Sequence, residues 1–326
     1  MAQKHSAPPP PDAIDEAVAG GHFDGTWFFE EHPEATRLAF RVTRRLHEEA
    51  SPYQKITVYD TPFFGRLLAI DDLVMLTQRD EFVYHEMLTH VPLCSLVDPK
   101  TVLIIGGGDC GCLREVLRHP GIERAVLCEI DERVTRVCEA WFDWVTPALA
   151  DPRAEVLFED GAAFLRNQTG VFDLIIIDST DPVGPAIPLF MADFYRQAAR
   201  ALKPTGVLTA QTESPAWTPQ LVGSIFHQQR QAFAHVAPYV GFIPTYQSGM
   251  WSWSYASHEP GPPDVSDGDR AAAIARTTRY YNPAIHRAAF ALPTFARRAC
   301  DGEDPFASFD RRARPLRDLT SSLGTD

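Results

Sequence analysis

TVLIIGGGDCGCLREVL, residues 101–117, is the stretch that decides the fold of this chain. Its apolar residues Val102 to Ile105 predict a buried strand that runs directly into three glycines and Asp109, and a helix opens near Leu113. Glycines at such a place permit a tight turn and let a ligand approach the main chain closely. The helix N-terminus beyond them offers free N–H groups and a partial positive charge. Taken alone, the turn fits a ligand site or a plain strand-to-helix connection.

An acidic residue at the end of the next strand favours the ligand site. The run AVLCEID, residues 125–131, ends in Glu129 and Asp131, about twenty residues beyond the glycines. In nucleoside-binding sheets an acid at this distance takes the ribose hydroxyls. The glycines do not fit the dinucleotide pattern G-x-G-x-x-G, and Asp109 stands where a pyrophosphate would pass. A carboxylate there disfavours a phosphate and suits a cationic ligand, such as a sulfonium or an amine.

Composition narrows the class of protein. The chain has 326 residues and is 45% hydrophobic, enough for one large domain or two modest ones. Its net charge of −13 argues against a nucleic-acid partner, although ordinary acidic solubility explains the bulk charge equally well. We find no run long and apolar enough for a membrane span and no signal-peptide core. The six cysteines form no C-x-x-C pair, so we expect no disulfide framework, no metal site and a cytoplasmic location.

Pattern along the chain predicts four regions. We expect a mobile tail over 1–26, a small β domain with a connecting helix over 27–95, a catalytic α/β domain over 96–300 and a polar tail over 301–326. Residues 37–50 fit either a strand followed by a turn or a short amphipathic helix. Strands and helices alternate beyond residue 100, which is typical of a doubly wound parallel sheet. The predicted strands are Thr101–Ile105, Ala125–Glu129, Ala154–Glu159, Phe172–Asp178 and Gly206–Thr212, with antiparallel edge strands from Trp251–Ser257.

Acidic residues recur where these strands end. One such acid is often only a helix cap, but four successive strands end in Asp109, Glu129, Asp160 and Asp178. The carboxyl ends of parallel strands meet at the ligand-binding edge of the sheet. Glu129 can bind a ribose there and Asp160 an adenine amino group. In IIIDSTDPVGPAIPLF, Asp178 and Asp181 precede a proline-rich loop and could hold an ammonium group and take a proton. The structural alternative is a capping Asp in a proline-rich connection.

Several of these segments together resemble the polyamine aminopropyltransferases, the spermidine synthase family. The matching pieces appear in family order: YQKI at 53–56, RDEFVYHEMLTHVP at 79–92, GGGD at 106–109, CEID at 128–131, FDLIIIDSTDPVGPA at 172–186 and IPTYQSGMWSWSYAS at 243–257. The resemblance implies a small N-terminal β domain followed by a Rossmann-like domain of the methyltransferase type, assembled as a homodimer or homotetramer.

The resemblance also implies a reaction. Decarboxylated S-adenosylmethionine, a co-substrate rather than a cofactor, gives its aminopropyl group to an amine, normally putrescine, and leaves as 5′-methylthioadenosine. By position, the donor contacts are Gln54, Asp109, Glu129, Asp160, Gly161 and Pro185. The amine contacts are Tyr84, His85, Asp109, Asp178, Asp181 and Tyr246, and Asp178 matches the family's proton acceptor. The sulfonium is already a good leaving group, so no metal is required.

Two departures from the family pattern bear on substrate choice. Many members have Gly-Gly after GGGD, where this chain has Cys110 and Gly111, and we expect Cys110 to narrow the donor pocket. Many members also carry a glutamine where Met75 stands. Cadaverine, agmatine or spermidine therefore stay open as acceptors. A methyltransferase on the same fold and a non-catalytic polyamine-binding protein are the alternatives from other classes.

Overall fold

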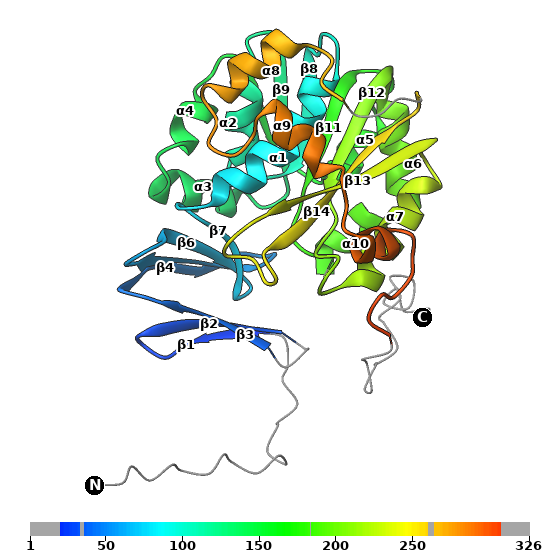
Figure 1. The fold of residues 1–326 in the computed structure, drawn as a ribbon. Helices are drawn as coiled ribbons and strands as arrows, with labels where there is room; N and C mark the ends of the chain where they lie inside the picture. The colour runs from blue at the N-terminus through cyan, green and yellow to red at the C-terminus, as the bar shows by residue number, and fades with distance from the viewer. Residues whose placement is uncertain (1–19, 33–35, 183, 260–263, 308–326) are drawn as a thin grey trace, which may run out of the picture.

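The N-terminal region folds as two small antiparallel sheets. The computed structural model describes residues 20–32, 36–182, 184–259 and 264–307 (Figure 1). Phe28 and Phe40 of the first sheet pack against Tyr59, Leu67 and Val74 of the second, so a shared apolar core holds the two sheets together. The strands of the first sheet are β1 (Gly20–Phe23), β2 (Trp27–His32) and β3 (Thr36–Arg41), and those of the second are β4 (Arg44–Ala50), β5 (Lys55–Thr61), β6 (Gly65–Ile70) and β7 (Leu73–Thr77).

Two expectations for this region change. The tail predicted over 1–26 is wrong for Gly20–Phe23, which pair with β2 through a turn in which Asp24 accepts from the Thr26 and Trp27 N–H groups. Residues 1–19 lie outside the described residues. The alternative left open for residues 37–50 is settled in favour of strands, because β3 pairs with β2 and β4 pairs with β5.

The second domain is built on a seven-stranded sheet in the order β10-β9-β8-β11-β12-β14-β13. The first five strands run parallel and β14 is antiparallel to both of its neighbours. We expected residues 251–257 at an edge, which is wrong: β13, which the sequence did not predict, covers them and forms the edge. The strands are β8 (Thr101–Gly106), β9 (Arg124–Glu129), β10 (Ala154–Phe158), β11 (Phe172–Asp178), β12 (Leu202–Gln211), β13 (His235–Phe242) and β14 (Met250–Ser257).

Helices cover both faces of this sheet (Figure 1). Alternate residues of β8 enter different cores, Val102 and Ile104 on one face and Leu103 and Ile105 on the other, as the side-chain period of a strand requires. The helices are α1 (Glu81–Ser95), α2 (Gly111–Leu117), α3 (Glu132–Trp141), α4 (Val145–Leu149), α5 (Gly161–Arg166), α6 (Ala192–Ala201), α7 (Pro219–Arg230), α8 (Gly268–Ala275), α9 (Pro283–Ala289) and α10 (Thr294–Cys300), with a 3₁₀ helix η1 (Gly184–Phe190).

The connecting helix α1 belongs structurally with the second domain. We grouped it with the β domain over 27–95, but it packs against α2, β11, β12 and β13 of the second domain. The β domain therefore ends at β7, and the first turn of α1 lies between the two domains. None of the helices in the described ranges is both long and apolar enough to cross a membrane.

Chain order places the site. The chain leaves β8 outward through β9 and β10, then returns to β11 on the other side of β8. In open α/β sheets, ligands bind at the carboxyl ends of the strands where the order reverses in this way. Gly106 at the end of β8 is in register with Asp178 at the end of β11, so the glycine turn and the predicted proton acceptor meet at this point.

Candidate active site

A cavity of about 480 Å³ opens at the reversal point, between the carboxyl ends of the strands, β7 and the first turn of α1. Pro185 belongs to η1, whose residues Ala186, Pro188 and Leu189 lie on the cavity wall. The other residues predicted for the site all line the cavity: Gln54, Tyr84, His85, Asp109, Glu129, Asp160, Gly161, Asp178, Asp181 and Tyr246.

The glycines form the turn because larger residues do not fit. Gly106 and Gly107 have φ of +78° and +66°, a left-handed conformation that glycine adopts without strain. A Cβ on Gly106 would collide with the Asp178 carbonyl oxygen. Further along the wall, a Cβ on Gly161 would lie 2.5 Å from Cγ2 of Ile105. The main chain thus comes close to any ligand seated on the sheet edge.

Cys110 does not line the donor pocket, contrary to the prediction from the sequence. We expected it to narrow the donor pocket, but it is fully buried in the apolar core and is absent from the described residues that line the cavity. Its backbone is left-handed, with φ of +60°. Glycine is the residue that fits this conformation best, so the departure from Gly-Gly concerns backbone strain. Met75, the other departure, does line the cavity.

The donor half of the cavity centres on Glu129. Its carboxylate accepts from the Gly108 N–H at 3.1 Å and from the Asp131 N–H at 2.8 Å. Burial raises the pKa of Glu129 to about 7 in spite of these two donors. A buried carboxyl of this kind forms strong hydrogen bonds with the hydroxyls of a ribose. Asp160 caps α5 by accepting from the Ala162 N–H at 2.8 Å.

Asp131 ties the β domain to this half. Its Oδ2 accepts from Gln54 Nε2 at 3.0 Å and from Ser51 Oγ at 2.6 Å, and its Oδ1 accepts from the Arg133 N–H as the cap of α3. The sequence showed Asp131 only as an acid after the second strand. An Asp directly before an amphipathic helix is a capping signal, but its second task, fixing Gln54, depends on a contact across the domain boundary.

The other half of the cavity is acidic, and its two aspartates differ. Burial would raise the pKa of Asp109, but the charge and N–H of His85, 3.3 Å away, and the Gly111 N–H hold that pKa below its usual value. Burial, followed by the charge of Asp109, raises the pKa of Asp178 to about 6. Oδ2 of Asp178 is buried without a hydrogen-bond partner in the described ranges. One carboxylate is therefore held in the anionic form, and the other can take up a proton.

A third acid, Asp181, lies on the same wall of the cavity. Burial raises the pKa of Asp181, a hydrogen bond from Glu213 opposes this, and the charge of Glu30 adds to it. Glu213 is buried, with a left-handed φ of +70°, and burial and the charge of Asp181 raise its pKa well above the usual value. The charge of Asp181 thus disfavours ionisation of Glu213. Glu213 directly follows the fifth predicted strand, Gly206–Thr212, and this position was its only signal in the sequence.

His85 lies between two carboxylates. Its Nδ1 is 2.7 Å from Glu81 Oε2 and its Nε2 is 3.3 Å from Asp109 Oδ1. Burial would lower the pKa of His85, but Asp109 and Glu81 raise it well above its usual value, which favours the protonated ring. Sequence reasoning missed Glu81. Its spacing of one helical turn from His85 was the available signal.

Aromatic rings close the cavity on its remaining side. The Tyr84 ring is 6.2 Å from that of Tyr246, and the Tyr246 hydroxyl donates to the Met75 carbonyl at 2.6 Å. Asp80 fixes the loop that carries Tyr246, because its Oδ2 accepts from the N–H and the hydroxyl of Thr245 at 2.9 and 2.7 Å. Asp80, too, was missed as a part of the site. The described residues include no group of three side chains placed to hold a metal ion.

Fold and site together define a Rossmann-like enzyme of the methyltransferase type, with a nucleoside pocket next to carboxylates suited to cations. Two family profiles match the chain: "Spermine/spermidine synthase domain" over residues 81–265 and "Spermidine synthase tetramerisation domain" over residues 26–78. The chain belongs to the spermine/spermidine synthase family, and it is a polyamine aminopropyltransferase, whose donor is a co-substrate and not a bound cofactor.

Individual relatives agree. The chain is 44% identical over 271 residues to the polyamine aminopropyltransferase of Moorella thermoacetica, covering 83% of this chain and 95% of the relative. It is 47% identical over 274 residues to that of Methylococcus capsulatus, covering 82% and 95%. A spermidine synthase solved with the transition-state analogue AdoDATO superimposes with a TM-score of 0.82 at 37% identity, covering 87% of this chain and 98% of that chain. Thermotoga maritima spermidine synthase gives 0.80 at 36%, covering 90% and 99%.

Proposed function

We propose that this enzyme is a spermidine synthase, which transfers the aminopropyl group of decarboxylated S-adenosylmethionine to putrescine. The observation that carries this proposal is the pair of unlike aspartates at the reversal point of the sheet. Asp109 stays anionic, whereas Asp178 is buried with its pKa raised to about 6. A cationic donor needs the first kind of group, and an amine that must lose a proton needs the second.

The bond changes follow from this pair. A neutral amine nitrogen attacks the aminopropyl carbon next to the sulfonium. The new C–N bond forms as the C–S bond breaks, and the electron pair of that bond goes to sulfur, which leaves as the neutral thioether of 5′-methylthioadenosine. Asp178 takes the proton that the nitrogen gives up, directly or through water. Holding the nitrogen in line with the C–S bond supplies the other large part of the rate.

Binding roles follow from position and charge. Glu129 takes the ribose hydroxyls, while Gln54, Asp160, Gly161 and Pro185 complete the nucleoside pocket. On the amine side, Asp109 and His85 lie against the aminopropyl group, and Tyr84 and Tyr246 enclose the methylene chain. Asp181, the third acid of the cavity wall, anchors the distal ammonium of the diamine. A diamine needs such a second anchor, which supports putrescine over a monoamine.

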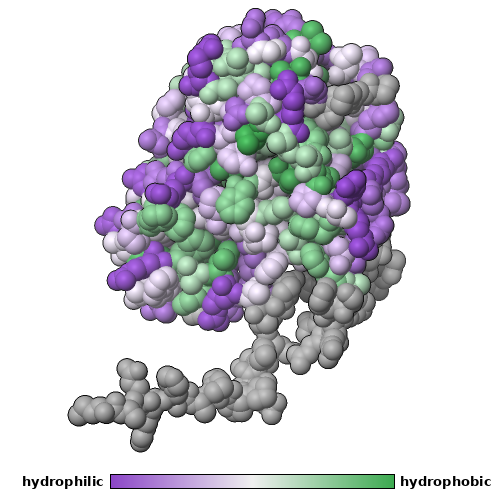
Figure 2. All heavy atoms as spheres, viewed as in Figure 1, coloured by the Kyte–Doolittle hydropathy of each residue, from purple (hydrophilic) through white to green (hydrophobic). Residues whose placement is uncertain are grey.

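The proposal for assembly rests on the surface of the β domain. Trp27 and Phe63 are exposed there, and Figure 2 shows apolar side chains gathered over this domain. Exposed apolar groups of this kind mark association surfaces. We therefore assign a homodimer or homotetramer formed through the β domain. All six cysteines are buried free thiols, which supports the reducing cytoplasm as the location.

The test is a competition assay. The purified enzyme is given decarboxylated S-adenosylmethionine with equal amounts of putrescine, cadaverine, agmatine and spermidine, and the products are identified by mass spectrometry. We expect spermidine and methylthioadenosine as the main products. A dominant product from another amine would replace putrescine as the acceptor, and release of no methylthioadenosine with any amine would refute the function. S-Adenosylmethionine in place of the donor tests for methyl transfer.

A further inference from the structure

Behind the substrate cavity, a chain of ionised side chains leads from Asp109 into the protein. Asp109 faces His85, and His85 faces Glu81, whose side chain is only 1% exposed. Arg114 Nη2 donates to Glu81 Oε2 at 2.8 Å and its Nη1 donates to Glu81 Oε1 at 3.1 Å. The residues come from α1, from the turn after β8 and from α2, so three elements meet at Glu81.

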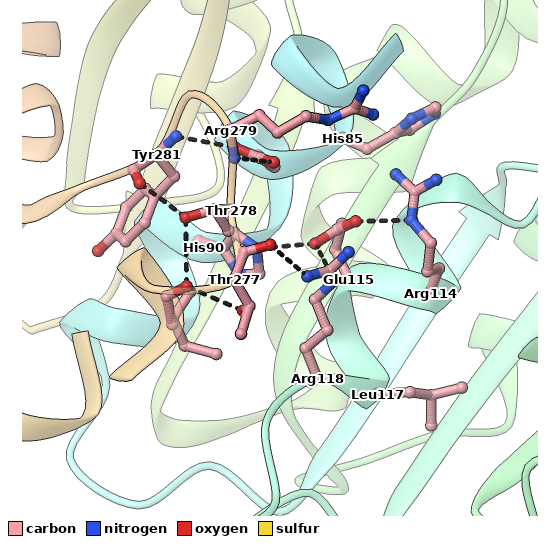
Figure 3. Close-up of polar contacts among 12 residues, drawn as sticks. His85, His90, Arg114, Glu115, Leu117, Arg118, Thr277, Thr278, Arg279 and Tyr281 are labelled. Carbon is pink, nitrogen blue, oxygen red and sulfur yellow. Dashed lines mark hydrogen bonds and ion pairs between the residues drawn. The ribbon is translucent and has the colours of Figure 1, made fainter. Parts of the chain in front are cut away.

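The far end of this chain is firmly held. Arg114 Nε also donates to Glu115 Oε1 at 2.6 Å, and the same carboxylate is met by Arg118 and His90 at 2.9 Å each. Figure 3 shows Arg114 and Arg118 both directed at Glu115, with His90 beside them. An arginine fixed by two carboxylates has little freedom to move, so it defines the position of Glu81.

We propose that Glu81 is a positioning residue for aminopropyl transfer: its carboxylate holds His85 as an imidazolium that aims an N–H at Asp109 and keeps Asp109 anionic. This inference rests on the proposed function only in the part that concerns turnover. Glu81 itself acts through His85. The protonation of His85 can be measured without any substrate.

Hydrogen-bond geometry requires the imidazolium. An imidazole ring has two nitrogens, and in the neutral form one of them carries a lone pair. Here each nitrogen faces a carboxylate oxygen, so a neutral ring would direct that lone pair at an anion. A Cβ on Gly111 would collide with the ring, so the ring lies tightly against the main chain of α2. Both nitrogens therefore carry hydrogens.

The charged groups around His85 also favour the imidazolium. Glu81 faces it from α1, Asp109 from the turn after β8, and Asp178 acts on it from the end of β11. Arg114 and Arg279 reach Glu81, the latter at 3.2 Å, and balance its charge. With Glu81 neutral, burial of His85 would be opposed by fewer anions, and the imidazolium would lose its proton at lower pH. The pKa values of Asp109 and Asp178 would then both rise.

The main experiment compares Glu81→Gln with Glu86→Gln. Glu86 is a buried carboxylate on the same helix, but it accepts from the main-chain N–H groups of Arg279, Tyr280 and Tyr281 and does not reach the cavity. We expect Glu81→Gln to lower kcat about tenfold or more and to move the acidic limb of the kcat–pH profile up by about one pH unit. Glu86→Gln lowers the melting temperature but leaves that limb in place.

Chemical rescue gives a second test that a purely structural role would not pass. Glu81 also lines a second cleft of about 430 Å³, together with Gln78, Arg114, Asp143, Trp144 and Arg279. A small carboxylate can therefore reach the vacated position. In Glu81→Ala we expect formate to restore kcat in a saturable way and chloride at equal ionic strength to have no effect. Failure of formate with folded, donor-binding protein counts against the carboxylate role.

Nitrogen NMR of ¹⁵N-histidine-labelled enzyme tests the ring directly. We expect both ring nitrogens of His85 to carry hydrogens in the unaltered enzyme at pH 8, and only one in Glu81→Gln. A neutral His85 in the unaltered enzyme overturns the inference, whether or not any variant folds. If the unaltered enzyme transfers no aminopropyl group, the proposed function fails, while this measurement still decides the state of His85.

Discussion

Asp178→Asn is the change that most directly separates catalysis from stability in this enzyme. Asp178 ends β11, lies on the cavity wall and is buried, with Oδ2 lacking a hydrogen-bond partner among the described residues. Asparagine has nearly the same shape but cannot accept a proton. A general base contributes about 10²–10⁴-fold to a rate, or about 3–5 kcal/mol of transition-state stabilisation. We therefore expect turnover to fall by that factor while methylthioadenosine still binds.

The pH dependence of turnover tests the same role of Asp178. The base works only when ionised, and the pKa of Asp178 is raised to about 6. The rate of the unaltered enzyme should rise with pH through about 6 and level off above 7, with about a tenth of the maximum remaining at pH 5. In Asp178→Asn this limb disappears from the residual activity.

The free energy of unfolding of the unaltered enzyme should fall with rising pH, whereas its turnover rises. The pKa of Asp178 rises from 3.8 in the unfolded chain to about 6 in the folded state, so the folded state binds more protons between these values. Stability is therefore lost as the pH rises from about 4 to 6, by about 3 kcal/mol when the carboxylate is fully ionised. The neutral variant avoids this loss, so Asp178→Asn should melt a few degrees higher at pH 7.5 and no higher at pH 4.

Asp173→Asn is the matched control. Asp173 lies near the other end of β11, and its carboxylate accepts from Lys203 Nζ at 2.8 Å and from the Lys100 and Thr101 N–H groups at 2.9 Å each. This variant should lose stability and retain turnover. Steady-state kinetics, calorimetry of methylthioadenosine binding and thermal melts at the two pH values measure all of this. Full turnover in Asp178→Asn would refute its role as base, and a lower melting temperature at pH 7.5 would refute the electrostatic reasoning.

Three further substitutions test other parts of the site. Glu129→Gln should weaken methylthioadenosine binding about 10–100-fold, measured by calorimetry, because a charged hydrogen bond contributes about 1.5–3 kcal/mol; unchanged affinity would remove Glu129 from the ribose site. Gly161→Ala places a Cβ 2.5 Å from Ile105, so it should lower the free energy of unfolding by about 1–3 kcal/mol and raise the KM for the donor. If neither quantity changes, the close packing of Gly161 on Ile105 is contradicted. Cys110→Gly should change the free energy of unfolding by no more than about 1 kcal/mol and leave both KM values unchanged, because Cys110 does not line the cavity. A change in acceptor choice would show that Cys110 determines specificity after all.

Much of the fold could be predicted because local pattern and global order agree. The apolar run before the glycines, the acids after successive strands and the alternation of elements are all local signals, and they suffice for a doubly wound sheet. Other features depend on partners far along the chain. Residues 251–257 were predicted as a strand, but only the pairing of β14 with both β12 and β13 shows that it is internal. Gly20–Phe23 likewise become a strand only because β2 pairs with them.

The residues named from the sequence for the cavity could be predicted, whereas the residues that hold them in place could not. Asp109, Glu129 and Asp178 follow strands directly, and motif resemblance supplied the residues on the opposite wall. Glu81 and Asp131 act on those residues from elsewhere, Glu81 through His85 and Asp131 through Gln54. The spacing of Glu81 from His85 and the position of Asp131 before α3 were local signals, but neither showed which site residue the carboxylate would hold. What identifies them is burial and contact across elements.

The contrast between Asp109 and Asp178 explains how one acidic cavity performs two tasks. Two carboxylates in one buried site repel each other, and a single proton or cation relieves the repulsion. Here the protonated ring of His85 lies against Asp109 only, so the pKa of Asp109 falls, while that of Asp178 rises to about 6. Environments that push the pKa values of neighbouring groups apart assign an acid or base role to each. Moving the imidazolium to Asp178 would exchange these roles, so the placement of His85 by Glu81 decides which aspartate binds a cation and which removes a proton.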